Sequence, residues 1–187
     1  MQGTIFGVTV EAIAGDDLAR KLVAACYLKG DFVLASGRRS KYYFDKYRFE
    51  TRPDLLAPVA ELIAARITPG VTRIAGPELG AVAIATAVSL SSGLPFIIVR
   101  GEAKEYGTSK RIEGPFEPGD EVVVLEDVLT TGGSVIKAAQ AVVDAGCRVT
   151  HIIGVVDREE GAREAIVAAG FGLEAVFTRS QLEQWMD

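Results

Sequence analysis

The apolar residues of this chain fall into two alternating patterns. Short continuous runs rich in valine and isoleucine are each followed by a segment whose apolar residues repeat at helical spacing. The most regular example is Val122–Leu125, which predicts a strand buried on both faces, followed by a helical pattern from Val135 to Val143. Strands that alternate with helices predict an α/β fold, with a mostly parallel sheet covered by helices on both faces.

The same patterns place the other elements. A helix is expected to begin at Asp16 or Asp17 and to end at Gly30, and Ser180 is expected to cap the last helix. No internal repeat or linker interrupts the chain, so residues 1–187 are predicted to form one domain. The remaining strands are expected from Arg73 to the turn at Gly76 and at 94–99, 148–156 and 173–178, and the remaining helices at 52–67, 82–90, 162–169 and 181–185.

Polar or charged segments follow four of the predicted strands. Because the carboxyl ends of parallel strands meet at one edge of a sheet, these segments are expected to form a single crevice. They are the turn after Gly76, Arg100, the stretch 126–134 and the pair Asp157-Arg158.

The stretch 126–134 has the composition of a phosphate-binding loop. Glu126 and Asp127 are followed by Thr130, Thr131, Gly132, Gly133 and Ser134, and then by a helix. Backbone N–H groups of such a loop and helix start can hold a phosphate, with hydroxyls as further donors. An ordinary helix-capping turn explains the loop taken alone equally well, but not the two acids beside it. The stretch is neither a Walker A loop nor a GxGxxG motif.

Composition excludes several classes of function. The 187 residues carry a net charge of −5, so no overall basic field would recruit nucleic acid. No apolar stretch is long enough to span a membrane, and the first residues lack the basic start and apolar core expected of a signal peptide. Cys26 and Cys147 lack metal-ligand spacing and are expected to be reduced core residues of a cytoplasmic protein. The single histidine, His151, is expected to be structural.

Two further segments lack a core pattern. Residues 31–45 form two strand-like runs joined by a polar turn, which would be a surface hairpin if they have no special role. Residues 101–115 have no sustained apolar period, which is typical of a functional lid or of a disordered segment.

The segment VVVLEDVLTTGGS resembles the motif with which type I phosphoribosyltransferases bind phosphoribosyl pyrophosphate (PRPP). The resemblance implies that Thr130 to Ser134 hold the ribose 5-phosphate, and that Glu126 and Asp127 bind the ribose hydroxyls. It also implies that the turn at Glu78, Leu79, Gly80 and Ala81 holds pyrophosphate through backbone amides. Many enzymes of the family carry a lysine where this chain has Gly80.

The pattern F-x-L-x-S-G-x-x-S-x-Y-Y-F-D is similar to the N-terminal hood of the orotate phosphoribosyltransferases, here residues 16–50. That resemblance implies that Tyr43, Phe44, Thr130 and Arg158 contact orotate, with Arg158 binding its carboxylate. A guanidinium suits this role because it binds a carboxylate through two parallel hydrogen bonds. From the residues alone, an ordinary helix start at Asp157 to Glu160 is slightly favoured over a carboxylate site.

The pattern R-x-E-x-K-x-Y-G-T resembles the flexible catalytic loop of the same family, here residues 100–118. By this match Arg100 and Lys104 neutralise the pyrophosphate, and Tyr106 stands where a histidine is frequent. Lys104, Arg100 and Asp127 are the candidate catalytic residues. The family usually has a lysine after the arginine, where this chain has Gly101.

Together the resemblances imply transfer of phosphoribose from PRPP to orotate in pyrimidine biosynthesis. Mg²⁺ would be held mainly by PRPP, without direct protein ligands. A homodimer with shared active sites is expected. The alternatives are a purine phosphoribosyltransferase and a PRPP-sensing regulator without catalysis. The hood and Arg158 disfavour the former, and the acidic net charge disfavours a regulator that binds nucleic acid.

Overall fold

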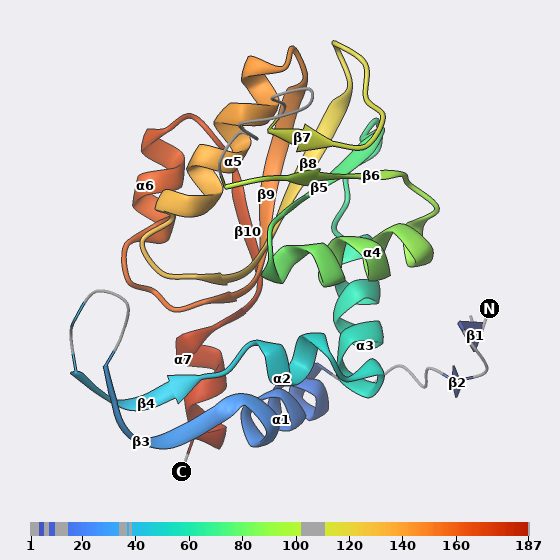
Figure 1. Cartoon of the computed structure of the whole chain (residues 1–187). Coiled ribbons are helices and arrows are strands. Elements are labelled where there is room, and N and C mark those ends of the chain that lie inside the picture. The colour runs from blue at the N-terminus through green and yellow to red at the C-terminus, as the bar shows by residue number, and fades with distance from the viewer. Residues whose placement is uncertain are drawn as a thin grey trace.

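The computed structural model describes residues 4–5, 8–9, 15–33, 37, 39–101 and 111–186. A six-stranded sheet in the order β10-β9-β8-β5-β6-β7 forms its centre (Figure 1). All neighbouring strands pair in parallel except the last, β7, which is antiparallel to β6. The predicted α/β fold with a mostly parallel sheet is confirmed. The strands are β5 (Arg73–Pro77), β6 (Phe96–Val99), β7 (Ile112–Glu113), β8 (Glu121–Leu129), β9 (Arg148–Asp157) and β10 (Leu173–Thr178).

Helices cover both faces of this sheet (Figure 1). In β8, Val122 and Val124 pack in one cluster with α5 and α6, whereas Val123 and Leu125 pack in a second cluster with α1, α3 and α4. All four side chains are fully buried, as the continuous apolar run predicts. The helices are α1 (Gly15–Cys26), α2 (Tyr47–Glu50), α3 (Pro53–Ala64), α4 (Gly80–Ser92), α5 (Gly133–Asp144), α6 (Ala162–Ala168) and α7 (Arg179–Leu182), and a 3₁₀ turn follows at Glu183–Trp185.

A hairpin stands apart from the sheet and, with α1 and α2, forms the predicted hood. Its strands, β3 (Tyr27–Val33) and β4 (Arg39–Phe44), pair antiparallel between α1 and α2 in the chain. A second short antiparallel pair, β1 (Thr4–Ile5) and β2 (Val8–Thr9), precedes the hood. In Figure 1 the hairpin extends beside α1 and α2, on the side where the chain leaves β10 for α7.

Four local details differ from the sequence expectations. Helix α1 ends at Cys26, and Gly30 lies inside β3, because Tyr27 already pairs with Phe44 in the hairpin. Thr178, not Ser180, caps α7 through a capping box with Gln181. The Ser180 hydroxyl instead donates to Glu159. Strand β8 continues through both acids to Leu129, and β7 lies within the stretch expected to be a loop.

The strand order creates a crevice between β5 and β8. From β5 the chain crosses through α4 to β6 on one side, and from β8 it crosses through α5 to β9 on the other. The connections therefore diverge at the carboxyl ends of β5 and β8. Such a switch point is where open α/β sheets bind their ligands.

Close packing of α4 on β5 requires a glycine at position 76. A Cβ there would lie 2.7 Å from the Cβ of Ala85 and 2.8 Å from the Ala81 carbonyl oxygen. We expect Gly76→Ala to lower the free energy of unfolding by roughly 1–3 kcal/mol, because the overpacked helix must shift. Urea denaturation measures this. Gly172→Ala is the matched control, since its Cβ would meet only ordinary contacts, and an equal loss there would contradict the packing argument.

Candidate active site

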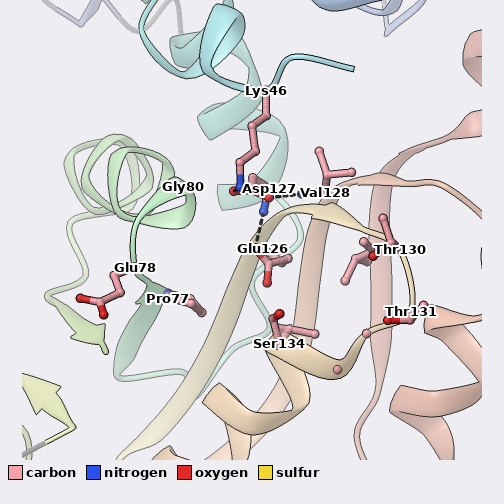
Figure 2. A pocket seen from close by; sticks show the side chains of 14 residues that line it. Lys46, Pro77, Glu78, Gly80, Glu126, Asp127, Val128, Thr130, Thr131 and Ser134 are labelled. Carbon is pink, nitrogen blue, oxygen red and sulfur yellow. Dashed lines mark hydrogen bonds and ion pairs between the residues drawn. The ribbon is translucent and has the colours of Figure 1, made fainter. Parts of the chain in front are cut away.

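A cavity of about 200 Å³ opens at the carboxyl ends of β5 and β8. Figure 2 shows side chains from three parts of the chain pointing into it: the turn after β5, the end of β8 with its loop, and the hood. The prediction from the sequence that the turn and the loop lie together is therefore correct. The lining residues are Lys46, Pro77, Glu78, Gly80 and the continuous stretch 126–135.

The loop between β8 and α5 presents hydrogen-bond donors to this cavity. Thr130, Thr131 and Ser134 line it with their hydroxyls (Figure 2). The N-cap of α5 is Gly132, which has no side chain to accept from the first N–H groups of the helix. Gly132 also has a φ of +80°, and a Cβ there would lie 3.2 Å from the Ala162 carbonyl oxygen. The loop and the positive end of the α5 dipole can therefore receive a phosphate.

Two carboxylates lie beside the loop on β8. Glu126 accepts a hydrogen bond from the backbone N–H of Asp127 at 3.1 Å, and Asp127 accepts one from the N–H of Val128. Asp127 is only 3% exposed. Its second carboxylate oxygen lies 2.6 Å from the ammonium of Lys46, which reaches it from the hood. Both acids can accept hydrogen bonds from a ligand's hydroxyls while the loop holds its phosphate.

The sequence patterns did not indicate Lys46, which lines the cavity, or Glu50, which interacts with Asp127. Lys46 follows the hood motif directly, yet no local pattern indicates contact with a residue 81 positions away. Glu50, on α2, is 5% exposed, and its Oε1 has no hydrogen-bond partner among the described residues. Its carboxyl faces Asp127 from the hood side. A buried acid in a short polar helix gives no distinctive sequence signal.

Burial controls protonation in this acidic cluster. It raises the pKa of Glu50 to about 7, and the neighbouring charge of Asp127 adds to the effect. The same two causes, in the same order, raise the pKa of Glu126 well above its ordinary value. The charge of Lys46 opposes both shifts. The cluster therefore takes up protons more readily than separate carboxylates would.

We expect these shifts to make folding less stable as pH rises. In the unfolded chain Glu50 loses its proton near pH 4.5, but in the folded protein only near pH 7. The folded state therefore binds the extra proton between these values, and the stability from Glu50 is lost as pH rises through this window. Glu50→Gln should reduce the difference in unfolding free energy between pH 5 and pH 8 by roughly 1–3 kcal/mol. Urea denaturation at pH 5 and pH 8 measures it, and an unchanged slope in the variant would contradict the shift.

The turn after β5 offers backbone donors, but not all that were predicted. Leu79 is the N-cap of α4 and Gly80 its first residue, so the N–H groups of Leu79, Gly80 and Ala81 lie at a helix start near the cavity. The N–H of Glu78 is instead bonded to the Val99 carbonyl at 2.9 Å. The expectation that the Glu78 amide binds pyrophosphate is therefore corrected: the sheet ladder already uses it. The Glu78–Leu79 peptide bond is cis.

The Glu78 side chain holds the start of the predicted catalytic loop. One carboxylate oxygen accepts from the Gly101 N–H at 2.9 Å, and the other lies 3.7 Å from the Arg100 guanidinium. The Arg100 N–H donates to the Arg111 carbonyl, so the two ends of the loop leave the sheet side by side. Lys104 and Tyr106 lie outside the described residues.

Arg158 does not line the cavity, but it contacts the hood. Its backbone N–H donates to the Leu129 carbonyl at the end of β8, and its guanidinium packs 5.6 Å from the centre of the Tyr42 ring. It also forms an ion pair with Glu160 at 2.7 Å. Its side chain is 13% exposed, and its Nε has no partner among the described residues. A guanidinium held this way can bind a carboxylate with its remaining donors.

The two predicted hood aromatics lie elsewhere. The Phe44 side chain is buried in the core cluster, and the Tyr43 ring packs against Phe32 at 5.6 Å. Neither residue lines the cavity. Tyr42, one position earlier, is the hood aromatic that contacts Arg158. Alternation along β4 explains why Tyr42 and not Tyr43 meets Arg158, because neighbouring residues of a strand face opposite sides. Phe44 shares the face of Tyr42 but packs in the core.

Among the described residues, no cluster of three or more His, Cys, Asp or Glu side chains could hold a metal ion by itself. In the cavity, Asp127 is already paired with Lys46, which leaves Glu126 and Glu78 as the other carboxylates that line it. A Mg²⁺ ion would fit here only if a phosphorylated ligand supplied most of its oxygen ligands, which is the usual mode for Mg²⁺.

The chain is similar to known proteins over most of its length. Residues 48–176 match the model of the family described as phosphoribosyl transferase domain. The chain is 46% identical over 170 residues to the orotate phosphoribosyltransferase of Halobacterium salinarum, covering 90% of this chain and 97% of the relative. It is also 46% identical over 173 residues to that of Thermococcus gammatolerans, covering 90% and 92%.

A solved structure is similar over the same span. The orotate phosphoribosyltransferase of Mycobacterium tuberculosis H37Rv, crystallised in complex with 5-phospho-alpha-D-ribosyl 1-diphosphate, superposes with a TM-score of 0.75 at 32% identity. The match covers 90% of this chain and 98% of the other.

Proposed function

This chain belongs to the orotate phosphoribosyltransferases within the phosphoribosyltransferase family, and we propose that its cavity binds PRPP and orotate and forms orotidine 5′-monophosphate and pyrophosphate. The observation that carries the proposal is one cavity in which two β8 carboxylates stand beside a hydroxyl-rich phosphate loop at a helix start. Such a site offers carboxylate acceptors, hydroxyl donors and the N–H groups of a helix start. These groups suit a ligand that carries a phosphate, a sugar and a leaving group.

In the proposed binding mode the loop Thr130–Ser134 holds the 5-phosphate. Glu126 and Asp127 accept hydrogen bonds from the ribose hydroxyls, and the N–H groups of Leu79, Gly80 and Ala81 lie on the pyrophosphate side. Displacement at the anomeric carbon creates positive charge on the sugar and negative charge on the leaving group. The protein's contribution is then mainly to orient the reactants and to stabilise these charges.

Arg100 and Lys104 are proposed to stabilise the departing pyrophosphate, with Tyr106 nearby. Support for Arg100 is its position directly after β6, where its guanidinium lies 3.7 Å from the carboxylate of Glu78, which lines the cavity. When pyrophosphate binds, the positive charges of Arg100 and Lys104 would have to outweigh the negative charge of Glu78. Mg²⁺ is the proposed cofactor, and when bound to PRPP it supplies further positive charge to the leaving group.

Orotate is proposed to lie between the loop and the hood. Thr130 would contact the base, and Arg158 would exchange Glu160 for the orotate carboxylate. The contact of Arg158 with Tyr42 supports a base site under the hood. Tyr43 and Phe44 would contact orotate only through their backbone, because their side chains pack elsewhere.

Two broader expectations belong to the same proposal. We propose a homodimer with shared active sites, supported by an exposed apolar groove of about 220 Å³ along α3 and α4. We also propose one domain in a cytoplasmic protein, supported by the two free, buried cysteines. No described helix is long and apolar enough to cross a membrane.

The decisive experiment is a turnover assay with the purified protein. The loss of orotate absorbance is followed with PRPP and Mg²⁺, and hypoxanthine and guanine serve as control bases. Turnover with orotate alone is expected, and would show that Gly101 is tolerated in the loop. Turnover with a purine alone would make the protein a purine phosphoribosyltransferase. Binding of PRPP without turnover of any base would make it a sensor.

A further inference from the structure

Lys46 is a cation delivered to the candidate active site from outside the sheet. It precedes α2, where its carbonyl accepts hydrogen bonds from the N–H groups of Phe49 and Glu50. The preceding residue, Asp45, donates its N–H to the last residue of α1. The backbone of Lys46 is therefore fixed by two hood helices, while its side chain reaches down to β8 (Figure 2).

The contact of Lys46 with Asp127 is short and largely shielded from water. The ammonium lies 2.6 Å from the Asp127 carboxylate, with the two side chains 30% and 4% exposed. The hood hairpin has a lysine pair of the same separation, Lys41 with Asp31, but its side chains are 85% and 60% exposed. A shielded pair fixes the direction of a carboxylate far more strongly than an exposed one.

Position 80 is shaped around this ion pair. A Cβ on Gly80 would overlap the carboxylate oxygen of Asp127 and would lie 2.9 Å from the ammonium of Lys46. The pair and a side chain at position 80 therefore exclude each other. The glycine is required by the ion pair rather than by its own backbone, because its φ lies outside the left-handed region.

The balance of acidic and basic side chains in the cavity indicates what the pair of Lys46 and Asp127 contributes. The described residues that line the cavity include three carboxylates, those of Glu78, Glu126 and Asp127, but a single ammonium, that of Lys46. Ionised carboxylates would repel a polyphosphorylated sugar, and burial already favours the protonated form of Glu126. With Lys46 in place, Asp127 keeps its acceptor oxygens in position while its negative charge is offset.

We propose that Lys46 is a positioning residue of the phosphoribosyl transfer: by its ion pair with Asp127, in the space left by Gly80, it aims that carboxylate at the ribose hydroxyls and couples the hood to the site. The inference deepens the proposed function and rests on it. Lys46 acts through Asp127 and is not assigned a contact with the reacting atoms.

The test compares PRPP binding by calorimetry and steady-state kinetics in Lys46→Met, Lys46→Arg and Lys41→Met. Lys46→Met should raise the Kd for PRPP by roughly tenfold to hundredfold, because a shielded carboxylate loses its partner. Lys46→Arg should restore most of the affinity. Lys41→Met is the matched control and should change neither affinity nor turnover.

The pH dependence of kcat/KM distinguishes a lysine that positions Asp127 from a lysine that only holds the hood in place. The titratable groups that face Lys46 are Asp127, Glu126, Glu50 and Tyr47. Because the Lys46 charge favours ionisation of Glu50 and Glu126, its loss should move the acidic limb of kcat/KM to higher pH. A lysine that only anchors the hood would lower the Tm and leave this limb in place, and that result would overturn the proposal.

Gly80→Ala offers a second route to the same pair. It keeps both charged residues but forces them apart, so it should reproduce the loss of PRPP affinity and the pH shift. The double variant with Lys46→Met should be no worse than either single variant, because both remove one interaction. Fully additive losses would overturn the inference. PRPP binding is measured without orotate, so a wild type that fails to turn over orotate would count against the proposed function alone.

Discussion

Replacing Asp127 by asparagine should reduce kcat/KM for PRPP by at least about 100-fold, with little loss of folding stability. Asparagine keeps the shape of the side chain but removes the negative charge that would accept from the ribose hydroxyls. It also leaves the Lys46 ammonium without its partner at 2.6 Å. Stability should change little because the variant relieves repulsion with Glu50 and Glu126, whose pKa values the Asp127 charge raises.

Asp54→Asn is the control for this variant. Asp54 also forms an ion pair at 2.6 Å, with Arg52, but at an exposed position on α3 away from the cavity. Its loss should leave kcat/KM unchanged. Steady-state kinetics and thermal unfolding of both variants measure the effects. Near wild-type activity in Asp127→Asn would show that this carboxylate does not bind the substrate.

Replacing Lys104 by alanine should lower kcat by about 10²–10³-fold while the Tm stays close to that of the wild type. The reason is that Lys104, in the loop after Arg100, is proposed to stabilise charge that develops on pyrophosphate only during the reaction. The chain has Gly101 directly after Arg100, so few other cations are available there. Removing an interaction made only in the transition state lowers kcat and kcat/KM together.

A surface lysine provides the comparison for Lys104. Lys21 lies exposed on α1, where it pairs with Asp17 at 2.7 Å, and Lys21→Ala should retain full activity. Single-turnover and steady-state rates, together with thermal unfolding, distinguish the two variants. Parallel losses of Tm and activity in Lys104→Ala would show a structural role and would refute its assignment to the leaving group.

The sequence by itself determined the layout of the fold and one side of the site. The apolar run Val122–Leu125 and the helical period after it identify β8 and α5, because burial on both faces leaves few other ways to arrange such residues. The Thr and Gly residues between them predict a phosphate-binding loop for the same local reason: residues close in sequence act together. The rule that parallel strands end at one edge then placed the Gly76 turn beside this loop.

Only the tertiary structure decided which distant residues meet there. Lys46 and Glu50 belong to a hood segment whose local pattern is that of a plain surface hairpin and a short helix. Their contact with Asp127 depends on how the hood packs on the sheet. The spacing of apolar residues along the chain does not indicate that packing. The direction of each hood aromatic was likewise decided by strand register, so Tyr42 rather than Tyr43 meets Arg158.

The role of the glycine at position 80 also depends on residues that are distant in the sequence. In sequence it is a small residue in a turn, with nothing to distinguish it from a glycine that a tight backbone requires. In three dimensions its missing Cβ makes room for the ion pair of Lys46 and Asp127. Local patterns encode secondary structure because their physics is local, whereas the charge balance of a site depends on contacts that form only when separate segments pack together.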